Sequence, residues 1–391
     1  MSSKTNISDM IIGHLRDRKI LFVPQFAPYF IASFGAHIFN LVNKQKGIFF
    51  EHGRIPDMRM HTLFVAPPGF FKSMLMKNLV HQDYGCLYVP ATSGNGSRVP
   101  MHFEGMVTEG AWTGSGYRDK KGTVIPIKGL AEEFSSGIVC FEEFSSLTST
   151  MKQQHSLTLD SQILTTLDEG LVRKRTTTRT IDYETNMTCW AGTQQGRFDL
   201  SSGLGRRMYF MNWVPTPEES NALKKAYWDG LNIPPDKPAL DKIRTEVSNL
   251  IDRVESIRKV DFDPAIPNLL GDVPHFEHRL HAHFAIGHQI MSGDFTDHLY
   301  VSMDETLRKL MVTAKSWREH LLSEAEGDQI IQILVQAGGK CTGIEICGRM
   351  LGFGSSVRQT RDILWRLANR ARLIDWNEKE DSVTLKHPFK P

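Results

Sequence analysis

Apolar, β-branched runs alternate with helix-like stretches between Thr62 and Val214, which predicts an α/β domain around a mainly parallel sheet. The expected strands are residues 61–66, 85–92, 137–142, 185–193 and 207–214. Before them, residues 7–45 predict helices that are interrupted near Pro24 and Pro28. After them the pattern becomes helical, with expected helices at 217–229, 237–260, 274–291 and 301–323.

The end of the chain has a pattern of its own. Helix-like stretches at 328–336, 341–351 and 355–371 precede two short apolar runs around an acidic turn at 377–381. Three helices and a β-hairpin are the outline of a winged helix. Its third helix carries Arg358 and Arg361, which favours DNA contact, although winged helices also dock proteins.

These patterns divide the 391 residues into four expected segments, with a linker at 323–328. They are an N-terminal helical segment (1–55), an α/β core with hairpin inserts (56–216), a helical lid (217–323) and the winged-helix domain (324–391).

Composition narrows the class of protein. Apolar residues make up 40% and charged residues 23%, which is typical of globular chains and excludes a disordered one. The 46 basic and 44 acidic residues leave a net charge of +2, so any surface for nucleic acid must be local. Five cysteines without a Cys-x-x-Cys pair indicate reduced thiols and a cytoplasmic protein.

Two segments bear on targeting. The first nineteen residues carry charges throughout, so they do not resemble a signal peptide. Residues 20–42 lack charged side chains and are long enough to span a bilayer, but their prolines and polar residues favour a buried pair of short helices. We therefore expect no membrane partner.

The segment APPGFFKS, from Ala66 to Ser73, follows an apolar strand and precedes an apolar helix. The pattern G-x-x-x-x-G-K-[ST] cradles phosphates in backbone N–H groups at a helix N-terminus, with a lysine on the β/γ-phosphates and a hydroxyl on Mg²⁺. Ala66 and Phe71 replace its two glycines. The expected contacts to ATP come from Pro68, Gly69, Phe70, Phe71, Lys72, Ser73 and Met74.

An apolar strand that ends in two acids, Glu142 and Glu143, is expected to supply the other half of a nucleotide hydrolase site. Glu142 would hold Mg²⁺ through water together with Ser73, and Glu143 would polarise the attacking water. The alternative is a strand that runs into a solvated helix start, where acids are also favoured.

Two further features complete the candidate site. The strand at 189–193 ends in Thr193 and Gln194, where a polar side chain can orient the attacking water. Arg206 and Arg207 come just before another strand, where a ring-forming ATPase presents an arginine to its neighbour's γ-phosphate. Two surface arginines in a loop are the alternative.

Two basic stretches predict contact with DNA. The run at 173–179 holds Arg173, Lys174, Arg175 and Arg179 in a pattern that suits a β-hairpin. The stretch 112–122 offers Lys120 and Lys121 near Trp112 and Tyr117. Such hairpins would meet backbone phosphate without sequence preference. Five histidines at 275–288 could hold a metal by spacing, but a polar lid helix is the better account.

The collinear order of these features resembles an AAA+ ATPase, and within that class the MCM replicative helicases. Residues 26–39 (FAPYFIASFGAHIF) are similar to the helix that precedes the ATPase core in that family, and 66–73 to its phosphate loop. Residues 110–147 resemble its hairpin insert, strand and acidic pair, and 166–208 its pre-sensor hairpin, sensor strand and arginine loop. The likeness covers about residues 20–290.

The resemblance implies a role for each matching position. Lys72, Ser73, Glu142 and Glu143 would form the catalytic centre, and Thr193 stands where the family has asparagine. Arg206 takes the finger position. Arg279 is the expected second sensor arginine, and Arg175 falls where the family's hairpin lysine grips DNA. Departures at Ala66, Phe71, Glu142 and Thr193 put fast hydrolysis in doubt.

The expected function is therefore an ATP- and Mg²⁺-dependent motor that forms a ring, expected to be a hexamer, and translocates along or unwinds DNA during replication. Few residues precede the loop, so we expect a shortened relative without the family's zinc and OB region, as in a virus, plasmid or mobile element. Replication proteins are possible partners in such a system. The alternatives are an ATP-switched DNA-binding or assembly factor with slow hydrolysis, and a protein-remodelling ATPase.

Overall fold

The computed structural model describes the chain apart from residues 1–5, 19–22, 47–48, 51–52, 55–58, 92–95, 106, 145–156, 169, 176–179, 195–203, 231–232, 234–235, 272, 353–355, 370–372 and 387–391. The chain divides into two compact units. The first extends to Ala314 and the second contains the residues from Lys315 onward.

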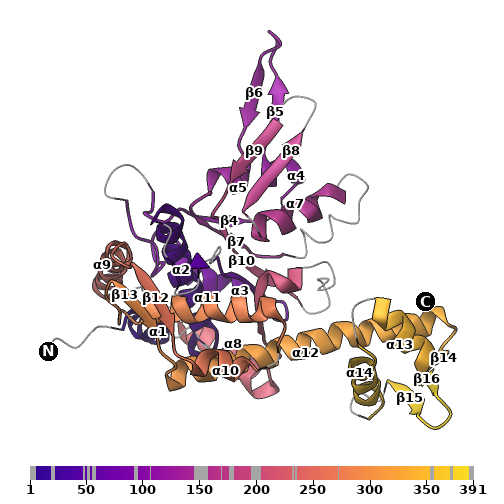
Figure 1. The fold of residues 1–391 in the computed structure, drawn as a ribbon. Helices are drawn as coiled ribbons and strands as arrows, with labels where there is room; N and C mark the ends of the chain where they lie inside the picture. Colours follow the sequence, from indigo (N-terminus) through magenta and orange to yellow (C-terminus); the bar gives the residue numbers. More distant parts are fainter. Residues whose placement is uncertain are drawn as a thin grey trace. The chain divides into compact units, whose positions relative to one another are not determined.

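A five-stranded parallel sheet forms the centre of the first unit (Figure 1). Its spatial order is β11-β3-β10-β7-β4, so β10 lies between β3 and β7. The strands are β3 His61–Val65, β4 Met101–Glu104, β7 Ile138–Phe141, β10 Thr188–Thr193 and β11 Met208–Asn212. The prediction of an α/β fold with a mainly parallel sheet is confirmed.

One predicted strand was wrong. Residues 85–91 form turns and irregular chain with a single β-bridge between Pro90 and Ser97. One edge of the sheet is formed by β4, whose sequence MHFE lacks the long β-branched run that usually marks a strand. Among the described strands it pairs with β7 only, so the hydrogen bonds to one neighbouring strand are enough to hold it in the sheet.

Helix α2 (Val23–Lys46) explains the uncharged N-terminal segment, because residues 26–40 are buried throughout. It is preceded by α1 (Ile7–Asp17) and contains Pro28 without ending there, so the expected pair of short helices is one long helix. Within the described chain, no helix is long and apolar enough to cross a bilayer.

Helix α2 is tied to the central sheet by buried polar contacts. Trp190 Nε1 of β10 donates to Ser33 Oγ at 2.8 Å, and that hydroxyl donates to the carbonyl oxygen of Met60 at 2.6 Å. His37 Nδ1 lies 2.8 Å from Thr188 Oγ1. These partners satisfy two of the polar side chains, Ser33 and His37, that the otherwise apolar helix buries.

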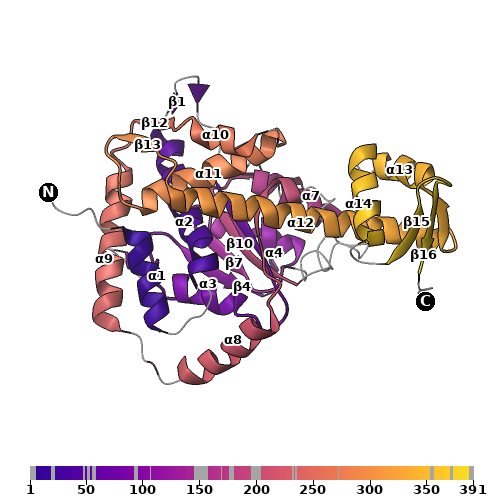
Figure 2. The same cartoon turned by 90° about the horizontal axis from the view of Figure 1, so that it is seen from below.

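Helix α11 (His275–Met291) packs against α2, and both views show the two helices side by side (Figure 1; Figure 2). The backbones approach closely where Gly35 faces Gly287, since a Cβ atom at either glycine would overlap a carbonyl oxygen of the other helix. A side chain at either position would therefore force the two helices apart.

The remaining elements of the first unit surround this core. A small four-stranded sheet has the order β13-β12-β1-β2. Part of the predicted helix 237–260 is strand β12, which pairs in parallel with β13. The elements are β1 Phe49–Phe50, β2 Gly53–Arg54, α8 Pro217–Gly230, α9 Lys237–Val254, β12 Lys259–Phe262, α10 Ala265–Leu270 and β13 His298–Val301.

Two β-hairpins extend from the end of the central sheet at which its strands begin, as Figure 1 shows. One leads through α5 into β7, and the other leads directly into β10. The elements are α4 Glu109–Thr113, β5 Ser115–Arg118, β6 Val124–Ile127, α5 Leu130–Glu133, α7 Leu157–Asp168, β8 Leu171–Arg175 and β9 Thr180–Glu184.

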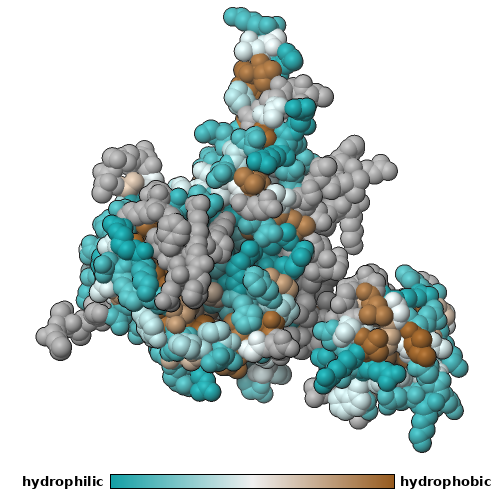
Figure 3. Space-filling view, viewed as in Figure 1, coloured by the Kyte–Doolittle hydropathy of each residue, from teal (hydrophilic) through white to brown (hydrophobic). Residues whose placement is uncertain are grey.

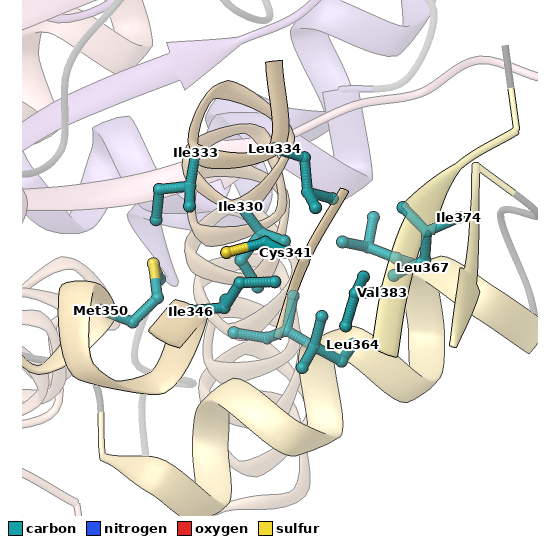
Figure 4. Packing of buried hydrophobic residues seen from close by; sticks show 11 residues of the cluster. Ile330, Ile333, Leu334, Cys341, Ile346, Met350, Leu364, Leu367, Ile374 and Val383 are labelled. Carbon is teal, nitrogen blue, oxygen red and sulfur yellow. The ribbon is translucent and has the colours of Figure 1, made fainter. Parts of the chain in front are cut away.

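The second unit has its own hydrophobic core, in which Ile330, Ile346, Leu364 and Val383 are buried together (Figure 4). Helix α12 contains residues 323–328, so the expected linker there is helical. The predicted three helices and hairpin are present, and β14 adds a third strand beside β16. The elements are α12 Glu305–Gln336, of which the residues from Lys315 onward belong to this unit, β14 Lys340–Thr342, α13 Gly343–Gly352, α14 Val357–Asn369, β15 Ile374–Asn377 and β16 Ser382–Leu385.

Candidate functional site: three strand ends and a lysine loop

We call the predicted phosphate loop, residues 66–73, the lysine loop. It joins the carboxyl end of β3 to the start of α3 (Lys72–Val80). Gly69 has φ +81° with open space where its Cβ would be, and the backbone at Phe71 is left-handed, with φ 50° and ψ 13°. The loop thus adopts a conformation that glycine favours at a position where this chain carries phenylalanine. A left-handed non-glycine residue costs about 1–2 kcal/mol.

The Lys72 side chain folds back over this loop. Its Nζ donates to the carbonyl oxygens of Ala66 at 2.8 Å and Pro67 at 3.0 Å, and the residue is buried. Burial lowers the pKa of Lys72 below its ordinary value, and the nearby charge of Glu143 opposes that shift. A desolvated ammonium at a helix N-terminus suits a phosphate ligand.

The two acids follow β7 directly, so the parallel register places them at the same sheet edge as the loop. Glu142 forms an ion pair with Lys77, which lies one helical turn after Ser73 on α3. Glu143 Oε2 accepts a hydrogen bond from Gln194 Nε2 at 3.2 Å. The sheet therefore brings the loop, the acidic pair and the end of β10 together.

Thr193 does not take the place expected for it. Its side chain is fully buried, and its hydroxyl meets no hydrogen-bond partner among the described residues. Thr193 is the last residue of β10, and Gln194 follows it directly. Gln194 is the residue at this tip that contacts Glu143.

Gly192 allows the close approach of these segments. A Cβ atom there would lie 2.9 Å from the carbonyl oxygen of Glu142 and 3.4 Å from Cβ of Lys72. Sequence reasoning missed Gly192 and Lys77. A glycine in an otherwise buried strand was the available signal for the first, because such glycines mark close backbone contact.

Arg206 and Arg207 lie at the opposite end of the sheet, where its strands begin. We call this end the arginine edge. Arg206 ends a short 3-10 turn (Leu204–Arg206) just before β11, whose first residue pairs with His61 at the start of β3. Arg206 is exposed, whereas Arg207 is largely buried and bonded to Asp168. The five residues of β3, at about 3.3 Å each, separate this edge from the lysine loop.

Arg279 also belongs to this opposite edge. Its Nη2 donates to Asp168 Oδ1 at 3.0 Å. The carbonyl oxygen of Leu167, next to that aspartate, lies 2.8 Å from Nε2 of His61. The structure therefore separates Arg279 from the lysine loop of its own chain, and the sequence-based assignment of Arg279 to the same nucleotide site does not fit this placement.

Of the predicted DNA contacts, Arg173 and Arg175 are exposed on β8, and Lys120 and Lys121 are exposed in the β5–β6 turn. Lys174 is different, because its Nζ forms a 2.8 Å ion pair with Glu109 and its side chain is only 19% exposed. Trp112 is fully buried and bonds Thr166. Arg179 lies outside the described residues.

The β5–β6 hairpin also exposes apolar side chains (Figure 3). Tyr117 and Ile125 are cross-strand partners, and Ile127 lies two residues further along, so the three share one face. In the second unit, Arg358 and Arg361 of α14 are exposed, and Arg361 lies 4.0 Å from Glu378.

Three of the five histidines of α11 have partners within the protein. His281 Nδ1 lies 3.1 Å from the hydroxyl of Tyr209, and His283 Nδ1 lies 3.1 Å from the carbonyl oxygen of Arg59. His288 lies 3.6 Å from Asp304. Within the described ranges, no three His, Cys, Asp or Glu residues gather as metal ligands would.

Phe71 offers a direct test of the loop conformation. If this loop binds ATP as the sequence predicts, Phe71→Gly should retain or strengthen that binding, because glycine adopts φ 50° without strain. Phe71→Val should weaken binding by about tenfold or more, since a β-branched residue is a true outlier in this conformation. Calorimetric titration with an ATP analogue measures the affinity of both variants. Equal affinities of the two variants would contradict the assignment of this loop as the phosphate-binding loop.

Comparison with protein-family models and with curated proteins finds no match to this chain.

Proposed function

We propose that this chain is an AAA+ ATPase resembling the MCM helicases, which assembles into a ring and uses ATP hydrolysis to translocate along or unwind DNA during replication. The observation that carries the proposal is the meeting of Lys72, Glu143 and Gln194 at one edge of a parallel sheet. Ligands of open α/β sheets bind at the carboxyl ends of the strands.

In this proposal the loop from Pro68 to Met74 holds the triphosphate. Lys72 would exchange its two carbonyl partners for phosphate oxygens, which bind an ammonium more strongly because they are charged. Glu143 would accept the proton of the attacking water, and Gln194 would hold that water and the carboxylate in line.

Ser73 and Glu142 would hold Mg²⁺. Hydroxyl and carboxylate oxygens are the ligands that this ion prefers. Glu142 already forms an ion pair with Lys77, on the helix that carries Ser73. When bound, Mg²⁺ would neutralise charge on the phosphates. Lys77 would have to release Glu142 for that purpose.

Arg206 supports assembly into a ring. An exposed arginine at the far edge of the sheet cannot reach the loop of its own chain. In the proposed ring it would face the γ-phosphate bound by a neighbouring copy. Arg279 lies at the same edge, so we assign it as well to the site of a neighbour.

Arg173, Arg175, Lys120 and Lys121 would contact DNA backbone from the two hairpins, in the sequence-independent manner of single-strand binding proteins. We assign Lys174 to hairpin stability instead, because Glu109 already binds it. The second unit would be a winged helix that uses Arg358 and Arg361 toward DNA or a partner protein.

Two observations favour a second candidate, an ATP-switched DNA-binding or assembly factor with slow hydrolysis. Phe71 strains the phosphate loop, and Lys77 competes with Mg²⁺ for Glu142. Both features would lower turnover without preventing nucleotide binding.

ATP turnover and strand displacement, measured with and without single-stranded DNA, separate the two candidates. The motor predicts turnover that DNA stimulates, together with strand displacement. The switch predicts nucleotide-dependent assembly with negligible turnover. A chain that stays monomeric with ATP and DNA would contradict both.

A further inference from the structure

Asp168, the last residue of α7, holds two arginines from distant parts of the chain. Its Oδ2 accepts a hydrogen bond from Arg207 Nη2 at 2.9 Å, and its Oδ1 accepts one from Arg279 Nη2 at 3.0 Å. Arg207 directly precedes β11, and Arg279 lies near the start of α11. One carboxylate therefore fixes the direction of both guanidinium groups.

The group carries an excess of positive charge. Asp168 faces the charges of Arg206, Arg207 and Arg279. Burial would raise the pKa of Asp168, but the hydrogen bond from Arg279 and the arginine charges outweigh it and hold that pKa below its ordinary value. The carboxylate thus remains charged near neutral pH and keeps both arginines bound.

The same residue stands at the base of the β8–β9 hairpin. Arg59 donates to the carbonyl oxygens of Thr166 at 2.9 Å, Asp168 at 3.3 Å and Met187 at 3.2 Å, so it clamps the end of α7 to the segment just before β10. The hairpin is closed at its base by a 2.7 Å hydrogen bond from Thr185 N to the carbonyl oxygen of Gly170. These hydrogen bonds fix the position of the hairpin base relative to Asp168.

We propose that Asp168 is a positioning residue that couples the β8–β9 hairpin to the arginine edge, so that DNA bound by the hairpin changes how Arg206, Arg207 and Arg279 face a neighbour's nucleotide. This inference rests on the proposed function. Because coupling between two binding sites is reciprocal, nucleotide and DNA should change each other's affinity by the same factor.

The test measures the affinity of the full chain for single-stranded DNA, with and without a nonhydrolysable ATP analogue and Mg²⁺. For the natural chain the two affinities should differ by about 5- to 150-fold. Asp168→Asn keeps the size of the side chain but removes its charge, and it should bring that ratio close to one. Glu184→Gln removes an exposed charge from the same hairpin and should keep the natural ratio.

The remaining outcomes decide against the inference. A natural chain whose DNA affinity ignores the nucleotide overturns it, as does Asp168→Asn with an unchanged ratio or Glu184→Gln with an equal loss. If Asp168→Asn does not fold, Asp168→Glu keeps the charge but moves the carboxylate that holds both arginines, and it must lower the ratio as well. Binding of both ligands without coupling would overturn this inference alone, whereas binding of neither would overturn the proposed function too.

Discussion

Replacing Glu143 with glutamine is expected to lower ATP turnover by about 10²–10⁴-fold, the usual contribution of a general base, while ATP binding persists. Glutamine has nearly the same shape and can still bond Gln194, but it cannot accept the proton of the attacking water. The charge of Glu143 also acts on Lys72, so some change in nucleotide affinity is expected, in the direction of tighter binding of an anion.

Glu133→Gln is the matched control, because Glu133 is an exposed glutamate just before β7. Turnover under saturating ATP and equilibrium binding of an ATP analogue should both stay natural in that variant. Glu143→Gln with normal turnover, or with binding and turnover lost together, would contradict the role given to Glu143.

The second large effect concerns stability. Gly287→Ala is expected to lower the free energy of unfolding of the first unit by about 3 kcal/mol or more. The new Cβ would overlap the carbonyl oxygen of Ala32 and lie 2.8 Å from the amide nitrogen of Ala36. Both atoms belong to the backbone of α2, so the clash cannot be relieved by rotating a side chain.

Gly13→Ala provides the control for this change. Gly13 lies inside α1, and apart from the backbone of its own helix and its chain neighbours no described atom lies within 4 Å of the place its Cβ would occupy. Alanine should therefore raise stability there by about 0.5–1 kcal/mol, since glycine is unfavourable within a helix. Urea unfolding followed by circular dichroism measures both variants, and similar effects in both would disprove the close crossing of α2 and α11.

Strong local patterns predicted much of the fold. The residues of β3, β7, β10 and β11 are largely apolar or β-branched and are buried throughout, as expected of parallel strands that are covered on both faces. The lysine loop and the acidic pair each follow such a run, so their common sheet edge follows from the direction of the strands. The three helices and hairpin of the second unit were predictable for a similar reason, since each has a clear period and a turn signal.

Other features depend on contacts that sequence patterns do not contain. Strand β4 is held by pairing with β7 rather than by its own propensity. Pro28 lies inside α2 because burial on all sides outweighs one missing backbone hydrogen bond. Whether Gln194 or Thr193 contacts Glu143 depends on which side chain at the end of β10 turns toward that carboxylate. The two arginines that bind Asp168 come from segments 39 and 111 residues away in the sequence.

Equilibrium binding of a nonhydrolysable ATP analogue with Mg²⁺ tests most directly whether the loop of Lys72 and the tip of Glu143 share one triphosphate. The account predicts saturable binding by the natural chain and by Lys225→Ala, which removes an exposed lysine of α8, and a loss of binding by Lys72→Ala. A natural chain that does not bind the analogue, or a Lys72→Ala variant that binds it equally well, would contradict the account.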